Sequence, residues 1–233
     1  MDELYVLYFT SASVAFIHTL LGPDHYVPFI VLSKARNWSV SKTLWITLVS
    51  GIGHVGGSVI LGMIGVGLGI SITKLESVEA FRGEIVGWIL LAFGVVYFLY
   101  GIYKYKEGKG HHNHFFMPRR IREAHHLPTG KNETKENEKT NITFWVLFLI
   151  FVFGPCEVLI PMLIFPAAEH STTGIVIVAV IFGIVTILTM IVAVYMGYRG
   201  MKLVKVKNRK EIFHILAGLI IAFLGISLQF LGW

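Results

Sequence analysis

Hydrophobic residues run along this chain in long stretches that short polar segments separate. A helix needs about 20 apolar residues to cross about 30 Å of hydrocarbon. Stretches of this length lie near residues 5–33, 43–70, 83–103, 142–168, 174–198 and 211–232. The pattern predicts an all-α integral membrane protein with six transmembrane helices.

The first stretch, residues 5–33, is too long for one upright helix. At 1.5 Å per residue it would measure roughly 43 Å. Gly22-Pro23 lies inside it, and a proline within a helix removes a backbone donor and kinks or ends the helix. We therefore expect the first span to be broken at this pair.

Composition supports a membrane protein, because 55% of the 233 residues are hydrophobic and only 15% are charged. The acidic start "MDELYVLYF" lacks the basic segment of a cleavable signal peptide, so the first apolar stretch is expected to stay as a span. The net charge of +6 arises from cations clustered between apolar stretches. Such clusters set membrane orientation, and no nucleic-acid partner is expected.

The positions of the cations predict the topology, because cytoplasmic loops carry the excess of lysine and arginine. Loops one, three and five are basic, whereas loop two balances Lys74 and Arg82 with glutamates and loop four has no lysine or arginine. Both termini are therefore expected outside, with residues 104–141 in the cytoplasm. This third loop holds five of the ten histidines, at His111, His112, His114, His125 and His126. They could collect metal ions, or the loop could simply be disordered.

The two halves of the chain look alike. A shift of 132 residues lays Gly22-Pro23-Asp24-His25 over Gly154-Pro155-Cys156-Glu157. We divide the chain into a three-helix repeat at 1–103, the polar loop at 104–141 and a second repeat at 142–233. Three spans separate equivalent elements, so the second repeat would be inverted, with the first and fourth helices broken. Secondary transporters built in this way bind their cargo at the midplane, where broken helices meet.

Three polar residues are predicted to lie at the same depth in the membrane. Asp24, His54 and Glu157 each lie roughly 15–20 Å below a predicted surface, which is near the bilayer centre. A carboxylate at that depth costs at least about 2.5–3.5 kcal/mol on insertion scales. It therefore needs a cation, a proton or a partner.

These side chains would suit a first-row transition metal, because imidazole, carboxylate and thiolate ligands together select such ions. Calcium and magnesium prefer oxygen ligands. The predicted metal ligands are Asp24, His25, His54, Glu157, Cys156 and His18. Simpler interpretations are that His54 packs between helices, that Asp24 and His25 neutralise each other, and that Cys156 is an inert core residue.

The stretches "GPDHYVPFIVLS" and "SGIGHVGGSVILG" resemble the paired signatures of the nickel/cobalt transporter superfamily, especially its UreH-type and NicO-type members. Asp24, His25, Gly53 and His54 match the Asp-His and Gly-His elements of these signatures. The spacing from His18 to Asp24 is longer than in that pattern, so His18 is the weakest of the predicted ligands. The resemblance implies a permease for a divalent transition metal, namely nickel or cobalt, with zinc as a further candidate.

The stretch "FGPCEVLIPMLIFPAA" is similar to the Pro-Cys motif of CcdA-type membrane electron carriers. Those proteins have six spans, an inverted repeat and one cysteine in each half. Here Asp24 occupies the position of the other cysteine, and Cys156 is the single cysteine of the chain. A relay between two cysteines therefore cannot operate within this chain.

Motifs of other functional classes are absent from the sequence. It contains no HExxH zinc-protease motif, GxSxG elbow or Walker loop, so neither an enzyme nor a prosthetic group is expected. The prediction is a metal permease that works by alternating access, with proton exchange at Asp24 or Glu157. One alternative is an exporter of a small anion such as sulfite, although no lysine or arginine is expected at mid-depth to attract it. The other is a CcdA-like redox protein that lacks the second cysteine.

Overall fold

The computed structural model describes residues 2–110, 131–156, 158–168, 171–203 and 210–231, and the secondary structure of these residues is helical throughout. In chain order the elements are α1 Asp2–Leu21, the 3-10 helix η1 Pro23–His25, α2 Val27–Ala35, α3 Val40–Gly67, α4 Ile72–Gly110, α6 Lys131–Phe153, α7 Leu159–Ala168, α8 Thr172–Leu203 and α9 Lys210–Leu231.

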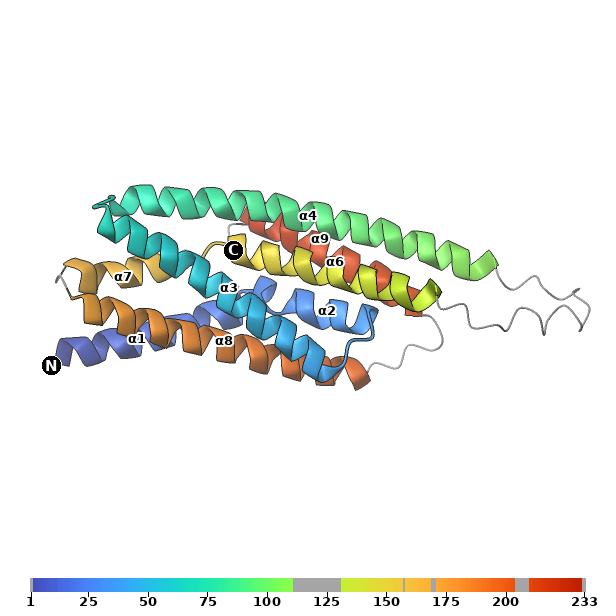
Figure 1. Cartoon of the computed structure of the whole chain (residues 1–233), viewed down its shortest axis with the longest axis horizontal. Coiled ribbons are helices and arrows are strands. Elements are labelled where there is room, and N and C mark those ends of the chain that lie inside the picture. Colours follow the sequence, from blue (N-terminus) through green and yellow to red (C-terminus); the bar gives the residue numbers. More distant parts are fainter. Residues whose placement is uncertain (1, 111–130, 157, 169–170, 204–209, 232–233) are drawn as a thin grey trace, which may run out of the picture.

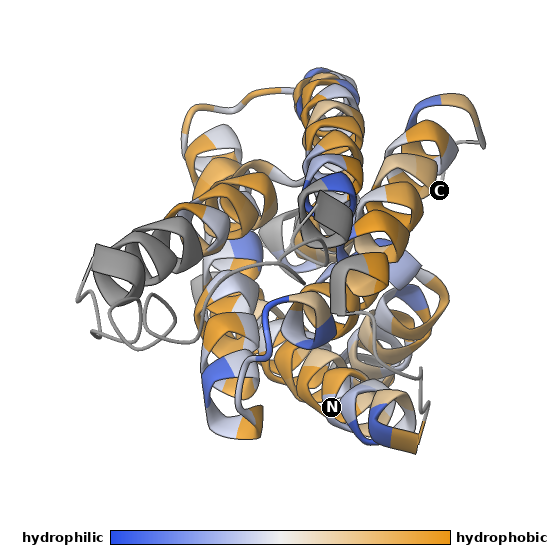
Figure 2. Ribbon diagram, turned by 90° about the vertical axis from the view of Figure 1, so that its right-hand side faces the viewer, coloured by the Kyte–Doolittle hydropathy of each residue, from blue (hydrophilic) through white to orange (hydrophobic). Residues whose placement is uncertain are grey.

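Four of these helices are long and apolar enough to cross a membrane, over Val40–Gly67, Thr73–Lys106, Thr173–Leu203 and Ile212–Phe230. Shorter apolar helices lie at Tyr5–Leu21 and Ile142–Phe153. Figure 2 shows that hydrophobic residues cover most of the ribbon of the long helices. Large apolar side chains such as Phe9, Ile60 and Phe223 point outward and are more than half exposed, as lipid-facing residues are. The chain is a multi-pass helical membrane protein, which confirms the predicted class.

Two apolar segments are interrupted. Helix α1 ends at Leu21, η1 follows, and α2 begins at Val27 with a proline in its first turn. Helix α6 ends at Phe153 and α7 begins only at Leu159. The predicted break of the first span is confirmed, and the second interruption falls at the Gly154-Pro155 pair, where a break was also expected.

Helix α4 is much longer than the predicted third span at 83–103. It begins at Ile72, directly after a tight turn in which Gly69 has a φ of +64°, a conformation that glycine adopts without strain. The charged residues predicted in loop two, including Glu79 and Arg82, therefore lie on helix α4. The apolar run at 83–103 underestimated the length of the helix, because it ended where charged residues begin. These two charged side chains are accommodated inside the bundle because they pair with each other.

Within the segment predicted as the loop at 104–141, α4 continues to Gly110 and α6 starts at Lys131. The five histidines of this segment lie outside the described residues. Figure 1 places the α2–α3 turn, the end of α4, the start of α6 and the end of α8 at one end of the bundle. The start of α1, the α3–α4 connection, the end of α7 and the start of α8 lie at the opposite end.

Helices α4 and α9 pack closely along glycines spaced seven residues apart, at Gly87, Gly94 and Gly101 on α4 and at Gly218 and Gly225 on α9. A Cβ atom at Gly94 would fall on the backbone of Ala222, and one at Gly218 would fall on the backbone of Phe98. Small residues allow membrane helices to approach in this way. The seam fixes the position of α4, and with it the charged residues of its first turns.

Helix α2 lies inside the bundle, in contact with α8 and α9. Phe29 and Leu32 are completely buried, and they share a core with residues of α6, α8 and α9 such as Leu147, Met190 and Ile221. The half-helix that follows the first break is thus surrounded by protein, as broken backbone at membrane depth must be.

The glycine seam can be tested with Gly94→Ala and Gly218→Ala. Each added methyl group would push α4 and α9 apart, and we expect the free energy of unfolding to fall by about 1–3 kcal/mol. Gly56→Ala on α3 is the matched control, because nothing lies within 4 Å of a Cβ atom there. Thermal unfolding in detergent measures the effect. Equal melting temperatures for all three variants would contradict the close packing.

Candidate functional site

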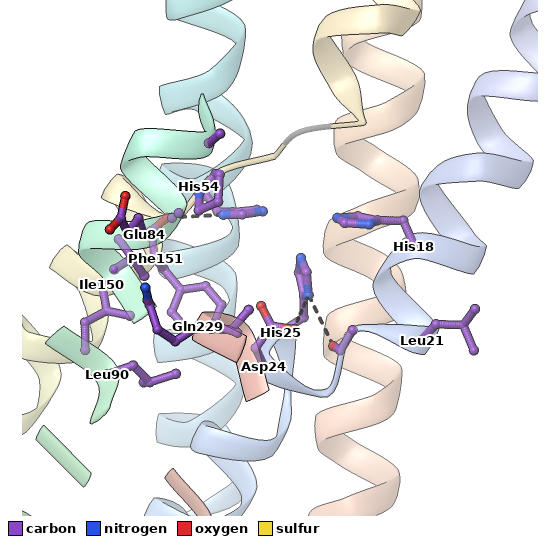
Figure 3. A pocket seen from close by; sticks show the side chains of 17 residues that line it. His18, Leu21, Asp24, His25, His54, Glu84, Leu90, Ile150, Phe151 and Gln229 are labelled. Atoms are coloured by element: carbon purple, nitrogen blue, oxygen red, sulfur yellow. Dashed lines mark hydrogen bonds and ion pairs between the residues drawn. The ribbon is translucent and has the colours of Figure 1, made fainter. Parts of the chain in front are cut away.

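A cavity of about 590 Å³ opens beside both helix breaks. Figure 3 shows His18, Asp24 and His25 on one side of it, with His54, Glu84, Phe151 and Gln229 across from them. Its remaining lining is mostly apolar, and includes Leu21, Leu90 and Ile150. The cavity therefore gathers the polar residues of the first break against the end of α6.

His25 is held by the backbone of the first break. Its Nδ1 atom lies 3.2 Å from the Gly22 carbonyl oxygen and 3.2 Å from Asp24 Oδ1. A Cβ atom at Gly22 would come within 2.6 Å of the same nitrogen, so only glycine fits there without displacing the ring. Both neighbouring oxygens accept, so in the neutral ring the hydrogen sits on Nδ1 and the lone pair on Nε2.

His54 is oriented by the second break. Its Nδ1 atom donates to the Phe151 carbonyl oxygen at 3.2 Å, near the end of α6. A carbonyl can only accept, so the neutral His54 ring also carries its lone pair on Nε2. The two breaks thus set the tautomers of two imidazoles that belong to different helices.

The three histidines form a row. The ring centroids of His18 and His25 are 5.0 Å apart, and those of His25 and His54 are 5.1 Å apart, each pair edge to face. His25 and His54 are each 4% exposed. All three Nε2 atoms are buried without a hydrogen-bond partner within the described ranges.

The chemistry of this cavity follows from its lining. Asp24 and Glu84 contribute carboxylates, His25 and His54 contribute lone pairs, and none of the lining residues is a lysine or an arginine. Buried acceptors are costly unless a donor reaches them. The cavity therefore suits protons and hydrogen-bond donors, and it disfavours anions.

Cys156 does not face this cavity, although the sequence placed it opposite Asp24. Its side chain is completely buried among residues of α1, α7 and α8, namely Ala15, Leu159, Leu163, Val178 and Phe182. Pro155 lines the cavity, whereas Cys156 is not among its lining residues. Glu157, the other ligand predicted from this segment, lies outside the described residues.

Sequence reasoning missed an ion pair that supports the second break. Glu79 is completely buried, pairs with Arg82, and accepts the Cys156 backbone N–H at 3.1 Å on Oε2. Arg82 Nη2 donates to the carbonyl oxygens of Val152 and Gly154, at 3.2 and 3.3 Å. Arg82 thus caps carbonyl groups that the end of α6 leaves without helical partners, while Glu79 accepts the backbone N–H that follows the break.

The expectation that no lysine or arginine lies at the depth of the breaks is therefore wrong, because Arg82 reaches the carbonyl oxygen of Gly154. Counting charges assigned Glu79 and Arg82 to an outer loop. Their spacing of three residues was the available signal, since residues so placed are neighbours on a helix.

The predicted metal centre is not formed by the described part of the chain. No group of three or more His, Cys, Asp or Glu side chains is arranged there to hold a metal ion. Asp24 engages the Nδ1 side of His25, whereas the ring nitrogens without a partner are Nε2 atoms. The side chains therefore gather around a cavity without converging on one point.

These features define a multi-pass helical membrane protein whose site lies between two broken helices. The sequence matches the family model of the cytochrome c biogenesis protein transmembrane region over residues 27–227. The chain belongs to that family. No curated protein and no solved structure matches the sequence.

Family membership corrects the functional prediction. The resemblance to the nickel/cobalt transporter superfamily is wrong, and with it the prediction of a nickel or cobalt permease. Those signatures were short polar motifs within two spans, whereas the family match extends across most of the chain. It agrees with the similarity of the Cys156 segment to CcdA-type carriers.

The ion pair predicts the effect of breaking it. Arg82→Met would leave the Glu79 carboxylate buried and unpaired, and we expect a loss of about 3–5 kcal/mol in the free energy of unfolding. The double variant Glu79→Gln/Arg82→Met should be less destabilised, because no charge stays buried. Lys74→Met, an exposed position on the same helix, is the control. Unfolding in a graded detergent mixture gives the values for the wild type and these three variants, and a double variant at least as destabilised as Arg82→Met would refute the coupling.

Proposed function

We propose that this protein carries reducing equivalents across its membrane by thiol–disulfide exchange at Cys156. Membership of the cytochrome c biogenesis transmembrane family is the observation that carries this proposal. The location of Cys156 at the interruption between α6 and α7 supports it. The chain acts as a carrier between partner proteins, without a prosthetic group.

A single cysteine can complete this exchange when the partners supply the other thiols. The Cys156 thiolate attacks the disulfide of an acceptor protein, which forms a mixed disulfide and releases one acceptor thiolate. One thiolate of a donor dithiol then attacks Cys156, which releases the second acceptor thiolate. The other donor thiolate closes the donor disulfide and regenerates the Cys156 thiolate. In sum, one dithiol is oxidised and one disulfide is reduced, and two protons pass from donor to acceptor.

The surroundings of Cys156 suit controlled access to a thiol. Glu79 and Arg82 hold the backbone on either side of the break, while the apolar cluster around the side chain excludes water. We infer that exchange needs a movement at the breaks that uncovers Cys156. The histidine row would take up and return protons, because its Nε2 atoms lie buried beside the same break.

We also propose that the chain consists of two inverted three-helix repeats, at 1–103 and 142–233. Each would contain a broken span followed by two continuous ones, giving six spans. The 132-residue shift and the two interruptions support this arrangement. Because the α2–α3 turn and the ends of α4 and α8 lie at one end of the bundle and carry lysine and arginine, we place that end and residues 104–141 in the cytoplasm and both termini outside.

The alternative of anion export has less support. Arg82 is a cation near the second break, but Glu79 neutralises it, and the lining of the cavity presents acceptors. An anion would meet carboxylates and ring lone pairs there. We therefore favour the redox carrier.

Electron transfer can be measured in proteoliposomes that hold a peptide disulfide inside and a dithiol peptide outside. Wild-type protein should produce internal thiols, and Cys156→Ser should reduce the rate to that of protein-free vesicles. Wild-type and variant protein are reconstituted in equal amounts. Equal rates for the two proteins would overturn the assignment of Cys156.

Burial also predicts the reactivity of the thiol. Cys156 in the folded protein should react with a maleimide several-fold more slowly than in protein unfolded by dodecyl sulfate, because only the thiolate of an accessible cysteine reacts. Phe182→Ala removes a ring from the surrounding cluster and should speed the reaction. Phe223→Ala, on the outer surface of α9, is the control. Rapid labelling of the folded wild type would show that no opening movement is needed.

A further inference from the structure

A second cavity, of about 190 Å³, lies at the basic end of the bundle between α2, the α2–α3 turn and the end of α8. It is separate from the histidine cavity and shares no lining residue with it. Its walls are Ser33, Lys34, Asn37, Trp38, Tyr198, Met201 and Lys202.

The charged and strongest polar groups of this cavity are donors. Lys34 and Lys202 contribute two ammonium groups, and none of the lining residues is acidic. Trp38 is 4% exposed, and its indole Nε1 is buried without a hydrogen-bond partner in the described structure. An indole nitrogen can only donate a hydrogen bond, so Trp38 Nε1 could bind an acceptor atom.

The walls are held in place by contacts within the protein. Tyr198 donates its hydroxyl hydrogen to the Trp38 carbonyl oxygen at 3.0 Å. Lys34 Nζ donates to the Met201 carbonyl oxygen at 3.0 Å, which offsets the negative end of α8. Lys202 Nζ lies 5.0 Å from the centroid of the Tyr198 ring. Lys34 and Tyr198 are therefore held in place before any ligand arrives.

We propose that this cavity binds a phosphate group, from an anionic phospholipid headgroup or from free inorganic phosphate. A phosphate offers several acceptor oxygens and a negative charge to ammonium and indole donors, and such charge-assisted hydrogen bonds are strong. The cavity has about the volume of six water molecules, which is enough for a phosphate and a few further atoms but too small for an acyl chain. Its location at the ends of membrane helices is where lipid headgroups lie. The proposal is independent of thiol exchange.

The test uses full-length protein purified in a maltoside detergent, with thermal shift and native mass spectrometry as the readouts. The probes are phosphatidylglycerol, a phosphate-free galactolipid and inorganic phosphate. Stabilisation and retained mass with phosphatidylglycerol, but not with the galactolipid, would support a lipid headgroup. The same response to inorganic phosphate alone would support the free anion. No response to either phosphate would overturn the proposal.

Variants locate the binding. Trp38→Phe removes the indole N–H together with the five-membered ring, and Lys202→Gln removes one charge from an exposed side chain. Each should weaken phosphate binding roughly tenfold, as the loss of one charge-assisted hydrogen bond does. Lys34 is left unchanged because it also caps α8. Lys74→Gln, at the opposite end of the bundle, is the matched control and should bind as wild type does. Wild-type affinity in both cavity variants would overturn the site.

Discussion

The structure depends on how it satisfies backbone groups where helices are interrupted inside an apolar bundle. A hydrocarbon environment offers no water to the carbonyls at the end of α6. Arg82, from α4, donates to the Val152 and Gly154 carbonyls, and His54, from α3, donates to the Phe151 carbonyl. The long helices thus act as caps for the broken ones. The Glu79 carboxylate can be buried here because it pairs with Arg82 and accepts a hydrogen bond from the Cys156 backbone N–H.

These capping contacts also determine the chemistry of the histidine cavity. A backbone carbonyl oxygen accepts a hydrogen bond from Nδ1 of His25 and of His54. The neutral ring therefore presents the lone pair of Nε2 to the cavity. Arg82 Nη2 meanwhile donates to the carbonyl oxygens of Val152 and Gly154 at the second break. Within the described residues the site contains no group arranged to hold a metal ion, and its histidines present acceptor atoms to the cavity. Its groups are spread along a row of rings about 5 Å apart.

Family membership and the single cysteine constrain the function together. The chain belongs to a family named for cytochrome c biogenesis, yet Asp24 stands where the repeat would place a second cysteine. One thiol cannot store two electrons as an internal disulfide, so in the proposed exchange partner thiols would complete each cycle. Because the Cys156 side chain is buried, the proposed exchange would also require the bundle to open beside the break between α6 and α7.

The sequence by itself determined the membrane class and the break after Leu21, because hydrophobic run length and glycine-proline pairs act locally. The predicted common depth of Asp24 and His54 indicated that they could meet, and the packing of α3 against the first break brings His25 and His54 together. Only the tertiary structure decided that α4 extends through its charged residues. It also decided that Arg82 caps a segment 70 residues away and that Cys156 turns from the cavity. These features depend on which helices pack together and on how a non-helical segment directs its side chains, and neither is written in a local pattern.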